Sequence, residues 1–349
     1  MRKRIVGIMI LLVGLLLISA CNTSTSSDEG NGSSGGEIEL KSADVVAGDS
    51  PYTIGMEEFS ETIYDETNGE IRINHFPAGQ LGDDSQIVDG VKIGSIDIGM
   101  VGTISSKVTE ALYLPFLFED SDHMHEVLDG EIGDELKKRF EEETGIKMIG
   151  FVYYAPRVLT TNGLEVNTPD DLKGLKIRVP EMPPVTATWQ ALGANPTPIA
   201  FTELFSSLEQ GVVDSQENPY EIIVNNSFYE VQDTVIETYH ALPVRFLIMN
   251  KDKFDSLTEE QQTTLEEEWL EASLEIEELY KEEDEKYRQV IEDHGVEFIE
   301  PDIESFREAT KDVWKDYAPE AFGEGVYEEI QSLRDGKNDD REHSCNKEI

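Results

Sequence analysis

Residues 174–220 constrain the fold of this chain more than any other stretch. Apolar and basic side chains alternate over residues 175–179, which is the period of a strand. Helical runs follow at residues 186–192 and 202–210, and a glycine comes directly after each of them. A second strand is predicted over residues 212–218. A strand, a helical connection and a second strand predict a parallel βαβ unit.

An earlier stretch of the chain has the same order of elements. Residues 69–73 predict a strand, residues 83–93 predict a helix, and residues 96–101 predict another strand. Two such units predict two similar α/β lobes with a cleft between them. Within the later unit, the prolines of residues 195–198 (NPTP) predict a turn between the two helical runs.

One long helix is predicted toward the C-terminal end. Residues 258–261 (TEEQ) have the pattern of a capping box, and neither glycine nor proline occurs from there to His294. A helix of about 36 residues would be roughly 54 Å long. A coiled coil is the alternative, but the apolar stripe contains mixed aromatic residues and lacks clean heptads.

The N-terminal end has the pattern of an exported lipoprotein. A short basic region precedes the apolar residues 5–18, which are too few to span a bilayer comfortably. Residues 17–21 (LISAC) resemble a lipobox, which predicts a signal peptide at residues 1–20 and lipidation of Cys21. An ordinary signal peptide with an incidental cysteine is the alternative. Residues 22–36 are rich in Ser, Gly and Thr, so we expect a flexible tether over residues 21–36.

The C-terminal end and the cysteine count add two expectations. Residues 335–349 are polar and have no periodic pattern, which predicts a disordered tail. The only other cysteine is Cys345, so a lipidated Cys21 leaves no intrachain disulfide. Stability must then come from the hydrophobic core, for which about 300 remaining residues in two domains are sufficient.

The charge and the motifs exclude several function classes. With 28 Lys and Arg against 73 Asp and Glu, the formal net charge is −45, which excludes nucleic acid as a partner. The chain contains no EF-hand loop, HExxH, Walker loop, GxSxG or dinucleotide fingerprint, so we expect no cofactor and no enzymatic activity. His123 and His125 would diverge on a helix, so we expect no metal site there.

Two polar residues in the central stretch are candidates for ligand contacts. Arg178 lies at the end of an apolar strand, and Asn218 lies at another strand exit. Ligands of open α/β sheets sit beyond strand ends, where an Arg can grip a carboxylate with two parallel bonds and an Asn can donate and accept. The alternatives are a structural ion pair for Arg178 and a turn-forming role for Asn218.

These motifs together resemble those of the extracytoplasmic solute-binding proteins of tripartite ATP-independent periplasmic (TRAP) transporters, the DctP-like family. The resemblance covers about residues 37–335. The motifs that carry it, in order and spacing, are GLKIRVP at 174–180, LGA at 192–194, PTP at 196–198, FTE at 201–203 and DSQENP at 214–219.

The resemblance implies a two-lobed periplasmic-binding-protein-like fold, with a ligand cleft between the lobes and the long helix crossing both. We expect lobe I to comprise residues 37–155 plus 244–283, and lobe II residues 156–243 plus 284–334.

The resemblance also implies a function and a ligand site. A small carboxylate-bearing solute, such as a C4-dicarboxylate or a sugar acid, would be captured outside the cell and delivered to the membrane subunits of a TRAP permease. Arg178 would grip the carboxylate, Asn218 would orient it, and Phe201 would cover it. Arg157 resembles the second substrate-facing arginine of the family, although Ala155 and Pro156 replace the usual Gly-Phe before it. A structural salt bridge of Arg157 is the alternative. The substrate-binding set is Arg178, Asn218, Arg157, Phe201 and Gln216.

Two other functions stay open at this point. An enzyme of the same fold class could use Glu217 as a general base, although no acid–base or nucleophile–base pattern is readable. A tethered binding protein could serve a sensor kinase instead of a permease, and the neighbouring genes would separate these two cases. In both binding roles the protein is extracytoplasmic and anchored to the cell membrane through Cys21.

Overall fold

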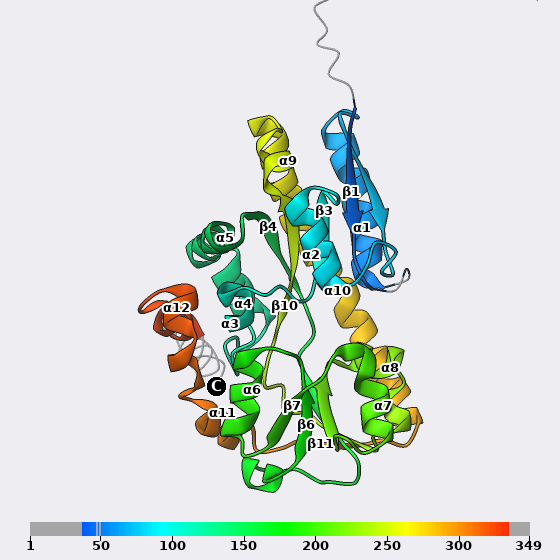
Figure 1. The fold of residues 1–349 in the computed structure, drawn as a ribbon, viewed down its shortest axis with the longest axis vertical. Helices are drawn as coiled ribbons and strands as arrows, with labels where there is room; N and C mark the ends of the chain where they lie inside the picture. The colour runs from blue at the N-terminus through cyan, green and yellow to red at the C-terminus, as the bar shows by residue number, and fades with distance from the viewer. Residues whose placement is uncertain (1–36, 47, 49, 335–349) are drawn as a thin grey trace, which may run out of the picture. The chain divides into compact units, whose positions relative to one another are not determined.

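The structure is a computed structural model, and it describes residues 37–46, 48 and 50–334. The predicted signal peptide, tether, lipidated Cys21 and polar tail lie outside the described residues. Two β-sheets with helices around them make up the described part (Figure 1). The α/β prediction is therefore confirmed.

The first sheet has five strands in the order β2-β1-β3-β10-β4. Its strands are β1 (Ile38–Ala43), β2 (Ile71–Phe76), β3 (Ile98–Val101), β4 (Ile146–Tyr153) and β10 (Val244–Asn250). β1 pairs in parallel with both β2 and β3, as expected for the first βαβ unit. The helices between these strands are α1 (Pro51–Glu66), α2 (Asp84–Ile93), α3 (Lys107–Ala111), α4 (Ser121–Leu128) and α5 (Glu131–Thr144).

The second sheet has six strands in the order β11-β9-β5-β8-β6-β7. Its strands are β5 (Val158–Thr161), β6 (Lys176–Val179), β7 (Asn195–Pro198), β8 (Ser215–Asn218), β9 (Thr234–Ile236) and β11 (Glu297–Ile299). The α-helices between its strands are α6 (Pro183–Ala191), α7 (Leu204–Glu209) and α8 (Tyr220–Asn225). β6 pairs in parallel with β8, so the predicted central βαβ unit is present.

Two local predictions in the central unit are wrong. Residues 195–198 form strand β7 and not a turn, and β7 pairs in parallel with β6. Because β7 is the last strand of its sheet, its two prolines need not donate to a further strand. The strand predicted from Val212 begins only at Ser215. The chain turns at Gly211, whose φ is 66°, and the residues between Gly211 and Ser215 are not yet part of the strand.

The chain passes between the two sheets at adjacent strand ends. β4 ends at Tyr153, β10 begins at Val244, and these two residues face each other in an antiparallel pair. β10 lies between β3 and β4, so the returning chain completes the first sheet. Beyond it lie α9 (Lys251–Asp255), α10 (Glu259–Asp293), α11 (Ile303–Thr310) and α12 (Ala318–Phe322).

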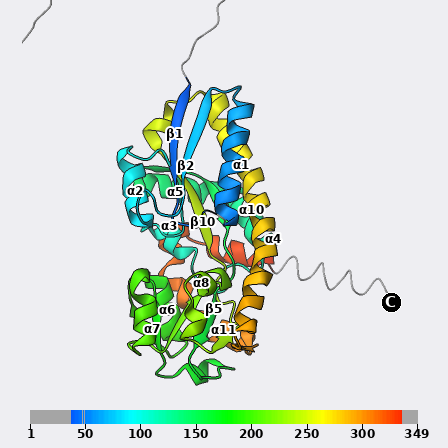
Figure 2. The same ribbon diagram turned by 90° about the vertical axis from the view of Figure 1, so that its right-hand side faces the viewer.

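Helix α10 is the long helix that the sequence predicted, with 35 residues and the expected capping box at Thr258. It contacts α1 and β4 of the first half of the molecule and α8 of the second (Figure 2). Two glycines permit the close packing: a Cβ atom on Gly150 would lie 2.5 Å from the Trp269 ring, and one on Gly55 would lie 2.1 Å from Ile276. The prediction of a helix that crosses both lobes is confirmed.

The C-terminal elements pack on both halves. Phe306 of α11 belongs to the apolar cluster of the second sheet. Val313, Phe322 and Ile330 belong instead to the core of the first sheet. The exact lobe boundaries given above stay a prediction. Within the described residues, no helix is long and apolar enough to cross a membrane.

Candidate functional site

A cavity of about 590 Å³ lies between elements of the two sheets. One wall comes from α2, the loop after β3 and the ends of α3 and α5. The other wall comes from the end of β6 and from residues 180–182 and 199–201. Of the five predicted ligand residues, Arg178 and Phe201 line this cavity.

Arg178 is a buried cation that has no counter-ion among the residues that the structure describes. Its side chain is on β6, whose apolar neighbours Ile177 and Val179 are fully buried, and Arg178 itself is 4% exposed. Nε donates to the carbonyl oxygen of Ile199 at 2.9 Å, and no carboxylate in the described part of the chain lies within 4.0 Å of the guanidinium. Burial lowers the pKa of Arg178 to about 10, with Glu217 and Arg157 acting in opposite directions. The guanidinium therefore stays charged at neutral pH.

Phe201 lies beside Arg178. The guanidinium carbon is 5.8 Å from the centroid of the Phe201 ring, which also contacts Phe228 edge-on at 6.2 Å. The Phe201 side chain is 44% exposed, so part of the ring is free to meet a ligand. The Arg178 guanidinium can bind an anion, and the exposed part of the Phe201 ring can pack on an apolar edge of the same molecule. This pair therefore suits a small organic anion.

In contrast to Arg178, Arg157 is paired with a carboxylate of the protein. Its Nε and Nη2 both donate to the carboxylate of Glu217, and Nη2 also donates to the Glu217 carbonyl oxygen at 2.7 Å and to Oδ1 of Asn218 at 2.9 Å. Burial alone would lower the pKa of Arg157, yet it is raised because Glu217 stabilises the charged form. In this structure, the donors of Arg157 are committed to β8.

Glu217 is fully buried and also accepts a hydrogen bond from Nε2 of His240 at 3.2 Å. Burial would raise the pKa of Glu217, but Arg157 and His240 outweigh it and lower the pKa to about 2. A carboxylate with so low a pKa and occupied oxygens is a poor general base at neutral pH. The arrangement gives no support to the enzymatic alternative.

Asn218 and Gln216 belong to a buried series of hydrogen bonds beside the ion pair of Arg157 and Glu217. Nδ2 of Asn218 donates to Oε1 of Gln216, and Nε2 of Gln216 donates to Oγ1 of Thr160 at 2.9 Å. Thr160 in turn donates to Gln232 at 2.9 Å. The bond from Gln216 to Thr160 joins β8 to β5, so these amides hold the strand next to β6 in place, and neither amide lines the cavity.

The sequence analysis missed Arg245, a second buried arginine on the first sheet. It lies on β10, with its guanidinium carbon 5.1 Å from the Tyr52 ring and 5.8 Å from the Tyr154 ring. Like Arg178, it has no carboxylate within 4.0 Å among the residues described. A single arginine in the apolar run of residues 244–249 (VRFLIM) is the signal that could have found it.

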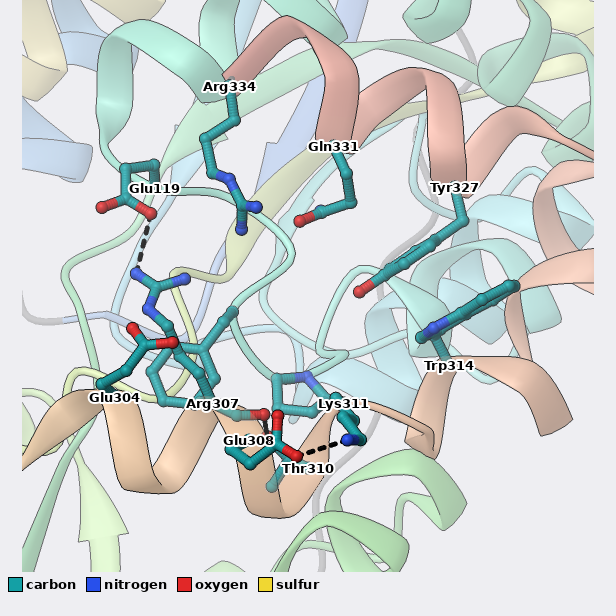
Figure 3. A pocket seen from close by; sticks show the side chains of 12 residues that line it. Glu119, Glu304, Arg307, Glu308, Thr310, Lys311, Trp314, Tyr327, Gln331 and Arg334 are labelled. Atoms are coloured by element: carbon teal, nitrogen blue, oxygen red, sulfur yellow. Dashed lines mark hydrogen bonds and ion pairs between the residues drawn. The ribbon is translucent and has the colours of Figure 1, made fainter. Parts of the chain in front are cut away.

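A second cavity, of about 450 Å³, lies beside α11 and residues 314–334 (Figure 3). Its Arg307 pairs with Glu119 at 2.7 Å, and its Lys311 pairs with Glu308. The rings of Trp314 and Tyr327 stack on each other, with their centroids 4.4 Å apart. Because these charges and rings already have partners within the protein, the cavity of Arg178 is the better candidate for an anionic ligand.

The histidines that were considered for a metal have other partners. His123 donates from Nε2 to the carbonyl oxygen of Ile330 at 2.9 Å. His125 contacts Asp129 at 2.7 Å and also Glu277, and these two carboxylates raise its pKa to about 9. In the described ranges, no three potential ligands are close enough together to hold a metal ion.

Comparison with known proteins gives one consistent family. The model of the DctP family, described as bacterial extracellular solute-binding protein family 7, matches residues 42–320. The 2,3-diketo-L-gulonate-binding periplasmic protein of Escherichia coli K12 is 36% identical over 250 residues, which is 70% of this chain and 76% of that protein.

Two solved structures have the same fold. A TRAP periplasmic solute-binding protein from Ochrobactrum anthropi has a TM-score of 0.80 and 32% identity, covering 88% of this chain and 98% of that one. Another, from Sulfitobacter sp. NAS-14.1 with bound β-D-galacturonate, has a TM-score of 0.75 and 30% identity, covering 85% and 99% of the two chains. The two-lobed fold is shared with these proteins.

Proposed function

Because this chain belongs to family 7 of the bacterial extracellular solute-binding proteins, the DctP family, we propose that it is the substrate-binding subunit of a TRAP transporter. It captures a small carboxylate-bearing solute outside the cell and delivers it to the membrane permease. The acids named for two similar proteins, 2,3-diketo-L-gulonate and β-D-galacturonate, support this class of ligand.

The single observation that carries this proposal is the buried guanidinium of Arg178 at the cavity, which pairs with no carboxylate of the described residues. A buried cation without a counter-ion is costly, and a bound carboxylate supplies the missing charge with two parallel hydrogen bonds. Phe201 then covers the ligand. Asn218, Gln216 and Arg157 act as positioning residues, since their polar groups bond to one another and to Glu217.

A screen by thermal unfolding tests the proposed function. We expect at least one small organic acid of four to six carbons to raise the melting temperature, because an acid at about 100 times its Kd adds roughly 2.7 kcal/mol of stability. The control is the corresponding primary amide, which lacks the charge that Arg178 recognises. Equal shifts with acid and amide, or no shift with any acid, would contradict carboxylate capture.

The membrane anchor is the part of the proposal that concerns Cys21. We expect a Cys21→Ser variant, expressed in a bacterial host, to move from the membrane fraction to the soluble extracytoplasmic fraction, because the thiol that carries the lipid is gone. Fractionation followed by immunoblotting measures this. Replacing Ser19, two residues earlier in the lipobox, by Gly is the matched control and should leave the protein membrane-bound. A Cys21→Ser protein that stays on membranes through a high-salt wash would disprove the anchor.

A further inference from the structure

Two acidic side chains lie at the contact between helices α8 and α10. Glu221, on the first turn of α8, is 3% exposed, and its Oε2 accepts a hydrogen bond from the Tyr280 hydroxyl of α10 at 2.9 Å. Asp284 lies one helical turn after Tyr280 on α10, and its Oδ1 is buried without a hydrogen-bond partner in the described structure. We call Glu221, Tyr280 and Asp284 the α8–α10 joint.

The α8–α10 joint connects the two halves of the molecule. Tyr280 belongs to the core of the first sheet, and its ring centroid is 5.3 Å from that of Tyr52 on α1. Helix α8 follows β8 of the second sheet, and Ile223 of α8 belongs to an apolar cluster on that sheet. Figure 2 shows α10 running alongside both halves. A movement of one half against the other therefore acts directly on the joint.

The sequence offers Asp284 two cations that the structure directs elsewhere. Lys281 and Arg288 stand three residues before and four residues after Asp284, which are the spacings of helical ion pairs. Lys281 instead pairs with Glu277 at 2.6 Å. Arg288 instead pairs with Glu237 at 3.2 Å. Among the residues described, neither acid of the joint has a cationic nitrogen within 4.0 Å.

The other groups around the joint do not neutralise its acids. Burial first, and then the charge of Glu221 or Asp284, raises the pKa of the surrounding phenols, which therefore stay uncharged. The guanidinium of β10 favours the charged form of Glu221 without contacting it. These neighbours are Tyr52 of α1, Tyr153 and Tyr154 at the end of β4, Tyr280 of α10 and Arg245 of β10.

Asp284 is the group of the joint that titrates near neutral pH. Burial, the charge of Glu285 and the charge of Glu221 together raise the pKa of Asp284 to about 7. Burial also raises the pKa of Glu221, against the hydrogen bond from Tyr280. As the pH rises through 7, Asp284 loses its proton, and the joint gains a negative charge that no cation of the described residues balances.

We propose that Glu221 and Asp284 make the α8–α10 joint proton-sensitive, so that proton uptake there sets the angle between the two halves and with it the width of the Arg178 cavity. Added negative charge is relieved when the helices separate or water enters, and a hinge movement does both without unpacking either core. By linkage, a solute that favours one angle must also change the proton occupancy of the joint. The joint acts in this way whichever solute the protein binds.

Energy transfer between two dyes measures the angle in the ligand-free protein. Ile93 of α2 and Val212 before β8 are exposed, so Ile93→Cys and Val212→Cys accept the dyes in a full chain that also carries Cys21→Ser and Cys345→Ser. We expect the transfer efficiency to change between about pH 5.5 and about pH 8.5, with its midpoint near pH 7.

Three variants connect this change to the joint. Asp284→Asn removes the titrating group and keeps its shape, so the transfer efficiency should stay at its low-pH value throughout. Glu221→Gln keeps an acceptor for Tyr280 but removes a neighbouring charge, so the midpoint should move to lower pH. Glu275→Gln is the matched control, since Glu275 is an exposed acid of the same helix, and its midpoint should equal that of the wild type.

Thermal unfolding gives a second readout and shows that the variant is folded. The pKa of Asp284 is about 7 in the folded protein, above the value of about 3.9 in an unfolded chain. The folded state therefore binds more protons between these values, and the wild type loses stability as the pH rises from about 4 to 7. The melting temperature of Asp284→Asn should rise relative to the wild type over this range and the difference should stay constant above it.

Each opposite result overturns the proton-sensitive joint. A wild-type transfer efficiency that is the same at the two ends of the pH range would show that the angle does not follow the proton. A change of equal size in Asp284→Asn would assign the effect to another group. A melting-temperature difference that stays constant from about pH 4 to 7 would show that Asp284 titrates as an ordinary exposed acid. Carboxylate capture at Arg178 stands in all three cases, because the acid screen tests it separately.

Discussion

An Arg178→Lys variant should lose nearly all binding of the carboxylate ligand, although it keeps the positive charge. A lysine ammonium is a single point of charge and cannot supply the planar fork that makes two parallel bonds to a carboxylate. Leaving a desolvated carboxylate poorly paired costs about 2–5 kcal/mol, which is roughly 30-fold to several thousand-fold in Kd. Calorimetry with the tightest acid from the screen measures the loss.

The same position allows a control that separates binding from folding. Because Arg178 is buried and has no counter-ion in the described part of the chain, Arg178→Met removes an unfavourable charge from the ligand-free protein. We expect the ligand-free Arg178→Met protein to melt no lower than the wild type, and yet to bind no acid. An Arg178→Lys protein that binds within a factor of three of the wild type would show that another residue grips the carboxylate.

The two arginines predicted for the site show where the sequence stops being informative. Arg178 lies at the end of an apolar strand and Arg157 follows the exit of another, so both are candidates for ligand contacts, and for each the sequence also allows a structural ion pair. What separates them is the register of β5 against β8, in which Leu159 faces Glu217 and Val158 faces Asn218. This register brings Glu217 to Arg157, sixty residues away along the chain, and no periodicity predicts it.

The strand β7 and Arg245 show two further limits. Residues 195–198 have the composition of a turn, and only their position at the edge of the sheet makes two prolines acceptable in a strand. Arg245 lies in a buried strand that returns from the other sheet, so its neighbours Asp84 and Gly102 are distant in the sequence. By contrast, the helix α10 was predictable because its cap, stripe and length are all local.

Removing the carboxylate of Glu217 should be strongly destabilising. In a Glu217→Ala variant, Arg157 and His240 stay buried without the group that they both contact, and breaking such a pair costs about 3–5 kcal/mol. Urea unfolding at neutral pH measures the free energy of unfolding. The matched control is the double variant Arg157→Met with Glu217→Leu, which removes both charges and should recover most of the loss.

The dependence on pH gives this prediction a second, independent readout. The pKa of Glu217 is about 2 in the folded protein, below the value of about 4.3 in an unfolded chain. The ion pair therefore contributes its full stability above about pH 4.3, and that contribution, roughly 3 kcal/mol, is lost as the pH falls through 2. Many other carboxylates titrate in this range, so the informative quantity is the difference between wild type and double variant. The two proteins should be similar in stability at neutral pH, and wild type should become steadily less stable than the double variant on acidification, because only wild type contains Glu217 and loses its stabilisation of Arg157. A difference that stays constant down to pH 2 would show that Glu217 is not ionised in the fold.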